Sequence, residues 1–209
     1  MKIAVVAANG KAGQAIVKEA VERKLDVTAV VRNENKTVAP NTLVKDLYDL
    51  TAADLTVFDV VVDAFGIFDP EKLDQHQTSL KHLADCLSGT KTRLLVVGGA
   101  GSLYMNPEHT MQLQDTPDFP EAFKPLANSM GKALDMLRTR DDVQWVYISP
   151  AADFQAEGER VGSYALAGEE FTVNEAGESQ ISYADYAIAV VDEIVQPTHQ
   201  QERISVYQQ

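Results

Sequence analysis

The sequence is poor in cysteine, in basic residues and in histidine. Cys86 is the only cysteine among 209 residues, which excludes an internal disulfide and a cysteine metal cluster. The 18 basic residues are outnumbered by 31 acidic ones, so the net charge is −13. Because phosphate backbones and anionic lipids attract basic surfaces, we expect neither nucleic acid nor membrane as a partner. The four histidines show no metal-ligand spacing, and we expect no metal.

Long hydrophobic runs are also missing. No apolar stretch approaches the roughly 18 residues of a membrane-spanning helix, and the chain starts directly with a strand-like segment. We therefore expect no transmembrane helix, signal peptide or transit peptide, and a cytoplasmic location. A chain of 209 residues that is 45% hydrophobic fits one domain, residues 1–209. The sequence leaves open whether the protein is a monomer or a homodimer.

The first residues predict a dinucleotide-binding unit. An apolar run ends in a glycine turn, after which apolar residues recur at helical spacing. Gly10 lets backbone N–H groups approach a pyrophosphate closely, and the helix N-terminus carries partial positive charge. Gly13 lets the helix pack tightly against the strand. Ala7 replaces the first glycine of the usual pattern, so a tight turn without a ligand is the alternative. The candidate phosphate-binding residues are Asn9, Gly10, Lys11, Ala12 and Gly13.

The residue after the second strand-like run, 26–31, bears on the choice of cofactor. An acidic residue at this place would bind a ribose 2′-hydroxyl, whereas an arginine suits a 2′-phosphate. Arg32 stands there. It favours NADP, with NAD still possible, and a solvated surface charge is the alternative.

Strand-like and helical segments alternate along most of the chain. Continuous Val/Ile/Leu runs separated by helices indicate an α/β protein: a doubly wound parallel sheet (Rossmann fold) with helices on both faces. The expected strands after the first two are residues 41–44, 59–64, 93–97 and 144–148, and the expected helices are 51–55, 70–87 and 127–138.

The second half departs from this alternation. Four prolines interrupt residues 103–125, a loop long enough to be a lid or binding segment. Residues 151–180 are glycine-rich and acidic, with a short strand expected at 171–173. A final helix is expected from Ser182 to Ile194, followed by a strand. We expect 151–180 and 197–209 to form a small C-terminal lobe on the substrate side.

Several segments together resemble one family. They are residues 8–13 (ANGKAG), 30–33 (VVRN), 93–104 (RLLVVGGAGSLY), 144–151 (QWVYISPA) and 181–187 (ISYADYA). They resemble the atypical short-chain dehydrogenase/reductase group known as the NAD(P)H-binding or NmrA-like family. Within it, the chain is similar to proteins described as NADH-flavin reductases and to the biliverdin reductase B type. The resemblance covers nearly the whole chain and implies a nicotinamide dinucleotide with a substrate above the nicotinamide.

The expected crevice lies outside the carboxyl ends of the strands. Similarity to the short-chain fold implies that Asp46 and Leu47 flank the adenine. It also implies that residues 64–66 pass the two riboses. The remaining candidate cofactor residues are Ala64, Phe65, Gly66, Gly98, Gly99, Ser149, Pro150 and Ala151.

The catalytic tyrosine of typical short-chain dehydrogenases is missing. None of the seven tyrosines has a lysine four residues on, and Asn128 stands four residues before Lys132. Hydride transfer to a planar conjugated acceptor such as a flavin or quinone needs no such acid, because stacking positions the reactants and water can supply the proton. Ser102 and Tyr104 are the catalytic candidates, as a hydrogen-bonding hydroxyl and a stacking ring. A serine that satisfies its own turn and a core tyrosine are the alternatives.

Two functions stay open. The first is an NAD(P)H-dependent reductase of a small planar acceptor. The second is a non-catalytic NAD(P)-sensing regulatory protein, which the NmrA-like resemblance implies. An epimerase is disfavoured because it also needs the tyrosine.

Overall fold

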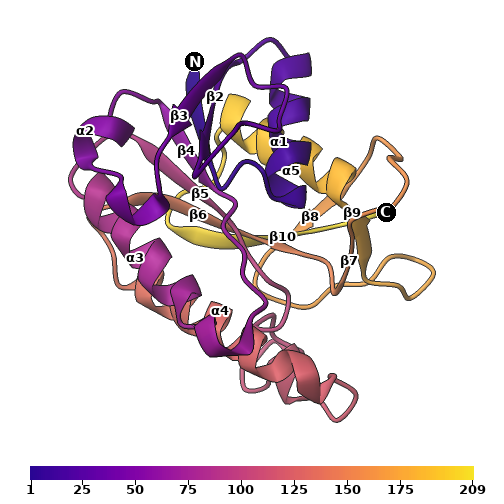
Figure 1. Cartoon of the computed structure of the whole chain (residues 1–209). Coiled ribbons are helices and arrows are strands. Elements are labelled where there is room, and N and C mark those ends of the chain that lie inside the picture. The colour runs from indigo at the N-terminus through magenta and orange to yellow at the C-terminus, as the bar shows by residue number, and fades with distance from the viewer.

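One eight-stranded sheet organises the computed structural model, which describes residues 1–209 (Figure 1). All neighbouring strands are parallel except the last pair, β10 and β8. The predicted parallel, doubly wound sheet is therefore confirmed. The spatial order is β3 (Asn41–Val44), β2 (Asp26–Val31), β1 (Lys2–Val6), β4 (Val60–Asp63), β5 (Arg93–Val97), β6 (Gln144–Pro150), β10 (Glu202–Tyr207) and β8 (Ala165–Ala167).

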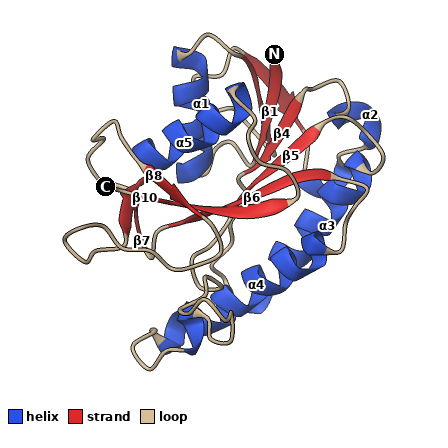
Figure 2. Ribbon diagram, turned by 180° about the vertical axis from the view of Figure 1, so that it is seen from behind, coloured by secondary structure: helices blue, strands red, loops and turns tan.

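Helices cover both faces of this sheet (Figure 2). On one face lie α1 (Lys11–Glu22) and α5 (Tyr183–Val195), over a core of 25 buried residues. On the other lie α2 (Ala52–Leu55), α3 (Gln75–Leu87) and α4 (Lys124–Arg138), over a second core of 19 residues. Because side chains alternate along a strand, β1 sends Ile3 and Val5 into the first core and Ala4 and Val6 into the second.

Polar side chains cap two helices, close to where the sequence predicts these helices to begin. Thr51 and Asp54 form a reciprocal capping box at α2, and the Ser182 hydroxyl accepts the Asp185 N–H at α5. Helix α4 begins earlier than expected, because Pro125 is tolerated in a first turn, where its missing N–H is not needed. The helix expected at 70–87 is divided into a 3-10 turn (Pro70–Lys72) and α3.

The C-terminal third corrects two expectations. The strand expected at 171–173 is wrong: these residues form no strand, and the Phe171 N–H instead bonds to the Tyr104 carbonyl. Residues 202–207 were expected beside the sheet but form β10 within it, because Ile204 and Val206 extend the first core. What lies beside the sheet is a parallel pair, β7 (Asp153–Gln155) and β9 (Gln180–Ser182).

The long segment between β5 and α4 contains no strand. It holds two 3-10 turns, Leu113–Asp115 and Glu121–Phe123. Isolated bridges join Tyr104 to Gln112 and to Glu170, which attaches this segment to the chain that follows β8. None of the helices has the length and apolarity needed to cross a membrane.

Candidate cofactor and substrate site

The turn between β1 and α1 exposes unpaired backbone donors. The first helical N–H to find a backbone acceptor is that of Gln14, which bonds to the Gly10 carbonyl at 2.8 Å. Gly10 is the N-cap residue and provides no side chain to cap the others. The N–H groups of Lys11, Ala12 and Gly13 are therefore free to bind an anion, which the partial positive charge of the helix N-terminus favours.

The glycines of this turn serve different purposes. A Cβ on Gly13 would lie 2.8 Å from the carbonyl oxygens of Ala7 and Ala8, so the packing of α1 on β1 requires glycine there. A Cβ on Gly10 would meet only the Ala7 oxygen, at 3.4 Å. The fold therefore does not need Gly10, and the space in front of it is open. Ala7 itself has a φ of 57°, so it keeps the left-handed backbone that a glycine would adopt easily.

Asn9 joins this turn to the segment after β2. Its side-chain amide donates to the Glu34 carbonyl at 2.8 Å, and its oxygen accepts the Lys36 N–H at 2.8 Å. Arg32 lies exposed in the same segment. The other six arginines of the chain all form salt bridges, whereas Arg32 forms none. A guanidinium without a salt bridge at the carboxyl end of β2 is chemically suited to a phosphate group.

The other candidate cofactor residues also follow strand ends, with differing side-chain environments. The Asp46 carboxylate accepts the Tyr48 N–H at 3.0 Å, and the Leu47 side chain is buried in the second core. Ala64 is buried, while Gly66 is exposed and has nothing within 4 Å of its missing side chain. Ser149 and Pro150 at the end of β6, and Ala151 directly after it, are all buried.

The glycines after β5 allow close packing. A Cβ on Gly98 would fall 2.2 Å from the Tyr147 ring, and one on Gly99 would lie 3.0 Å from the Met130 sulfur. The Gly99 N–H donates to the Tyr147 hydroxyl at 3.3 Å. These glycines therefore hold the end of β5 close to β6 and α4.

The Ser102 hydroxyl is occupied by a buried arginine. It accepts a hydrogen bond from Arg203 Nη1 at 2.9 Å, and Ser102 is itself buried. Arg203, on β10, also pairs with the Glu169 carboxylate and bonds to the Glu169 carbonyl. Burial lowers the pKa of Arg203, and the Glu169 charge opposes that effect. Ser102 thus helps to anchor the turn, and its role toward a substrate stays a prediction.

Tyr104 is half-buried in the same anchored segment. Its ring stacks on His109, with ring centroids 4.2 Å apart and planes 4° apart. The Arg203 guanidinium lies 5.7 Å from the Tyr104 ring centroid, and His109 Nε2 lies 2.8 Å from a Glu170 carboxylate oxygen. The catalytic role of Tyr104 also stays a prediction.

Sequence reasoning missed Arg203. The local sequence gives no clear signal, because β10 also contains Glu202 and Ser205, and the partners of Arg203 lie 101 and 34 residues away in the sequence. Asn128 and Lys132, which stand at the spacing of the missing acid–base pair, are both exposed on α4.

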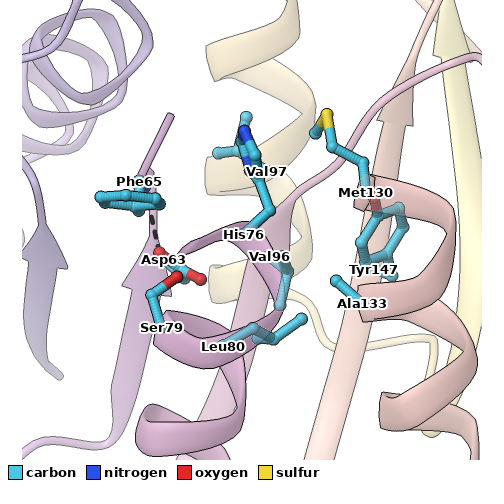
Figure 3. Close-up of a pocket in the computed structure, with 10 residues that line it drawn as sticks. All are labelled: Asp63, Phe65, His76, Ser79, Leu80, Val96, Val97, Met130, Ala133 and Tyr147. Atoms are coloured by element: carbon cyan, nitrogen blue, oxygen red, sulfur yellow. Dashed lines mark hydrogen bonds between the residues drawn. The ribbon is translucent and has the colours of Figure 1, made fainter. Parts of the chain in front are cut away.

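A second missed residue is Asp63, the last residue of β4. It is 4% exposed, and its carboxyl accepts the Phe65 N–H at 3.0 Å. Burial raises the pKa of Asp63 to about 6. It borders a cavity of about 10 Å³ (Figure 3), roughly the space of one water molecule. The other residues that line this Asp63 cavity are Phe65, His76, Ser79, Leu80, Val96, Val97, Met130, Ala133 and Tyr147.

His76 lies in a packed environment beside this cavity. It is buried, its Nε2 lies 2.9 Å from the Ile67 carbonyl, and the Phe65 ring meets it edge-on at 5.8 Å. Burial lowers the pKa of His76, so its ring is neutral at about pH 7. No group of three or more His, Cys, Asp or Glu residues is placed to hold a metal ion.

Comparison with known proteins identifies what the chain is similar to. The NAD(P)H-binding family profile matches residues 7–197. The uncharacterized protein YwnB of Bacillus subtilis (strain 168) is 46% identical over 209 residues, which cover 99% of this chain and 98% of that protein. The crystal structure of "a putative NADH-flavin reductase" from Streptococcus pneumoniae TIGR4 is 55% identical, with a TM-score of 0.98 and full coverage of both chains. That of a "putative epimerase" from Bacteroides thetaiotaomicron is 32% identical, with a TM-score of 0.81 and coverage of 99% and 96%.

Proposed function

Because this chain belongs to the NAD(P)H-binding family, we propose that it is a reductase that passes a hydride from NADPH to a planar conjugated acceptor such as a flavin or quinone. The observation that carries the proposal is the N-terminus of α1, where three unpaired N–H groups stand beside the open space in front of Gly10. The description of the Streptococcus pneumoniae relative as "a putative NADH-flavin reductase" supports the acceptor class.

Each part of the cofactor has residues suited to it. Lys11, Ala12 and Gly13 bind the pyrophosphate through backbone N–H groups, and the unpaired Arg32 binds the 2′-phosphate. Residues 46–47 and 64–66 border the adenosine and the riboses. Residues 98–99 and 149–151 border the nicotinamide, and the bound cofactor supplies the hydride.

On the acceptor side of the site, residues 99–104 provide a fixed surface rather than an acid–base pair. The Arg203–Glu169 pair and the Ser102 hydroxyl hold residues 99–104 in place, and the Tyr104 ring is braced by His109. Rigid positioning of an acceptor against the nicotinamide lowers the entropic cost of hydride transfer. An epimerase would need a proton-transfer group in reach of the substrate carbon, and no tyrosine–lysine pair is available for it.

A non-catalytic NAD(P) sensor is the second candidate. The observation that favours it is the burial of Ser102, whose hydroxyl oxygen accepts a hydrogen bond from Arg203 and so serves to anchor the turn.

The two candidates separate in one experiment. NADPH oxidation is followed by the loss of NADPH absorbance with FMN, FAD, riboflavin and a series of quinones as acceptors. Cofactor affinity is measured in parallel by calorimetry. The reductase proposal expects turnover on at least one planar acceptor. Tight NADPH binding with no turnover on any of them would favour the sensor.

A further inference from the structure

The Asp63 cavity holds a buried carboxyl that lacks a counter-charge. The Phe65 N–H is its one hydrogen-bond donor, and no salt bridge reaches it. A carboxylate removed from water without a nearby cation is costly. Its ionised form is therefore stabilised whenever a positive group comes close.

The elements packed around Asp63 provide no such group. On α3, His76 faces the cavity, but its Nε2 is bonded to the Ile67 carbonyl and burial lowers its pKa, so it is uncharged at neutral pH. On β6, Tyr147 is neutral because burial raises its pKa to about 12. The neighbours from β1, β5 and α4 carry no titratable group: Val6, Val96, Met130 and Ala133.

The cavity does hold an uncommitted hydroxyl. Ser79, on α3, is 1% exposed, and its Oγ has no hydrogen-bond partner. Figure 3 shows the Ser79 side chain next to Asp63, with His76 farther along the same helix. A hydroxyl can donate to a carboxylate or accept from a carboxylic acid, directly or through one water molecule. The cavity can therefore accommodate both protonation states of Asp63.

The position of Asp63 relates it to the cofactor. It directly precedes residues 64–66, which border the riboses in the proposed function. The same cavity includes Val97 and Tyr147, and the Tyr147 hydroxyl holds the Gly99 N–H. The carboxyl thus shares a cavity with Val97 and Tyr147, which adjoin the strand ends that the proposed function assigns to the nicotinamide. The nicotinamide ring is positively charged when oxidised and neutral when reduced, so only the oxidised ring interacts favourably with a carboxylate.

We propose that Asp63 sets the preference of the site between the two redox states of the cofactor: its ionised carboxylate favours NADP⁺ over NADPH, and its protonation removes that preference. This inference rests on the proposed function, because it requires a nicotinamide cofactor in the crevice. By linkage, binding of NADP⁺ promotes loss of the Asp63 proton to solvent, whereas binding of NADPH does not.

The test is a pair of binding constants measured against pH. The dissociation constants of NADP⁺ and NADPH are determined by calorimetry between about pH 5 and pH 8, and their ratio is followed. The 2′-phosphate also titrates in this range, but it is common to both cofactors and cancels in the ratio. We expect the ratio to shift by about tenfold toward NADP⁺ as pH rises, and Asp63→Asn to make it independent of pH.

Asp59→Asn is the matched control. It makes the same chemical change at the residue that directly precedes β4, where the Asp59 carboxylate accepts the Lys2 N–H. The ratio of the two dissociation constants should keep its pH dependence in this variant. A ratio that is constant in the parent, or that varies equally in Asp63→Asn, overturns the inference while leaving the proposed function standing. If neither cofactor binds, the proposed function itself fails.

A spectroscopic readout does not depend on the variant. Infrared difference spectra of the parent protein follow the C=O band of a buried carboxylic acid. That band should vanish at a lower pH with NADP⁺ bound than with NADPH bound. Loss of the band at the same pH in both complexes contradicts the inference, whether or not Asp63→Asn folds.

Discussion

At the scale of single residues, Gly10 and Gly13 separate binding from folding. Both belong to one sequence pattern, yet only Gly13 is required by close packing, since its Cβ would meet backbone oxygens at 2.8 Å. The sequence pattern predicted both glycines. Only the three-dimensional structure distinguishes a glycine that the fold needs from one whose empty space is available to a ligand.

Gly10→Val should weaken cofactor binding without unfolding the protein. The new side chain fills the space assigned to the pyrophosphate, and Gly10 has a φ of −67° that valine can adopt. We expect the NADPH dissociation constant to rise by tenfold or more, about 1.4 kcal/mol, with the melting temperature nearly unchanged. Gly13→Ala is the contrasting variant and should lose stability. Parent-like NADPH affinity in folded Gly10→Val would place the phosphates elsewhere.

Arg32→Ala should remove a preference for NADPH over NADH. A charge-assisted contact to the 2′-phosphate contributes roughly 1.5–3 kcal/mol, so NADPH affinity should fall by about one to two decades while NADH affinity is unchanged. Lys18→Ala is the matched control, because it removes one exposed positive charge from α1. Equal affinities of the parent for the two cofactors would argue against a phosphate contact.

Asp63 should make the unliganded protein less stable as pH rises. The folded-state pKa, about 6, lies above the unfolded value of about 3.9. Below about pH 4 both states are protonated and Asp63 has no effect. Between about pH 4 and 6 the unfolded chain ionises first, so stability falls, and above about pH 6 the loss is complete.

Urea unfolding of Asp63→Asn tests this sign. At about pH 7 the variant should be more stable than the parent by on the order of 1–3 kcal/mol, and the gain should disappear near pH 4. A variant that is less stable than the parent at neutral pH would show that the carboxylate is satisfied in a way the cavity does not reveal.

At the scale of elements, the sequence predicted most strands and helices because each apolar run is continuous and lies between helical segments. The strand expected at 171–173 is wrong, although Phe-Thr-Val has a high β propensity, because no strand lies beside it. A strand forms a few residues earlier instead. It is β8 (Ala165–Ala167), whose Ala-Leu-Ala sequence has a low β propensity but which pairs with β10. Pairing partners distant in sequence decide both cases.

The candidate site also has a part that the sequence predicted and a part that it did not. The cofactor-binding residues 9–13 and 32 belong to short local motifs, which can be recognised in the sequence. Arg203 and Asp63 could not be predicted as site residues, because their importance comes from burial and from contacts across the sheet rather than from neighbours in sequence. For Asp63, a charged residue at the end of the apolar run Val60–Asp63 is the one signal in the sequence, and β10 offers no such signal for Arg203.

The anchored turn should tolerate loss of the Tyr104 hydroxyl. No hydrogen bond involves that hydroxyl, and the ring that stacks on His109 remains in Tyr104→Phe. We expect most of the turnover to be retained, and Ser102→Ala, which strips Arg203 of a partner, to cost about tenfold or less. Steady-state NADPH oxidation with the best acceptor measures both. A roughly thousandfold loss in Tyr104→Phe with intact cofactor binding would instead indicate a catalytic hydroxyl.

At the scale of the whole molecule, NADPH should stabilise the fold by mass action. A ligand that binds only the folded state contributes about 2.7 kcal/mol at a concentration 100 times its dissociation constant. For a chain of this size that corresponds to a rise in melting temperature of roughly 5–10 °C. Differential scanning fluorimetry measures this rise in melting temperature for the parent and for Gly10→Val at the same NADPH concentration, and the rise should be smaller in the variant. An equal rise in both proteins would show that the stabilisation does not come from this crevice.

The edges of the eight-stranded sheet constrain how copies of the molecule can associate. One edge is β3, with four residues, and the other is β8, with three. Edges this short offer few free N–H and C=O groups to a strand from another molecule, and the net charge of −13 repels a second copy. Continuous intermolecular sheets, and the fibrils that grow from them, are therefore disfavoured. If two copies associate, they do so through helices or loops.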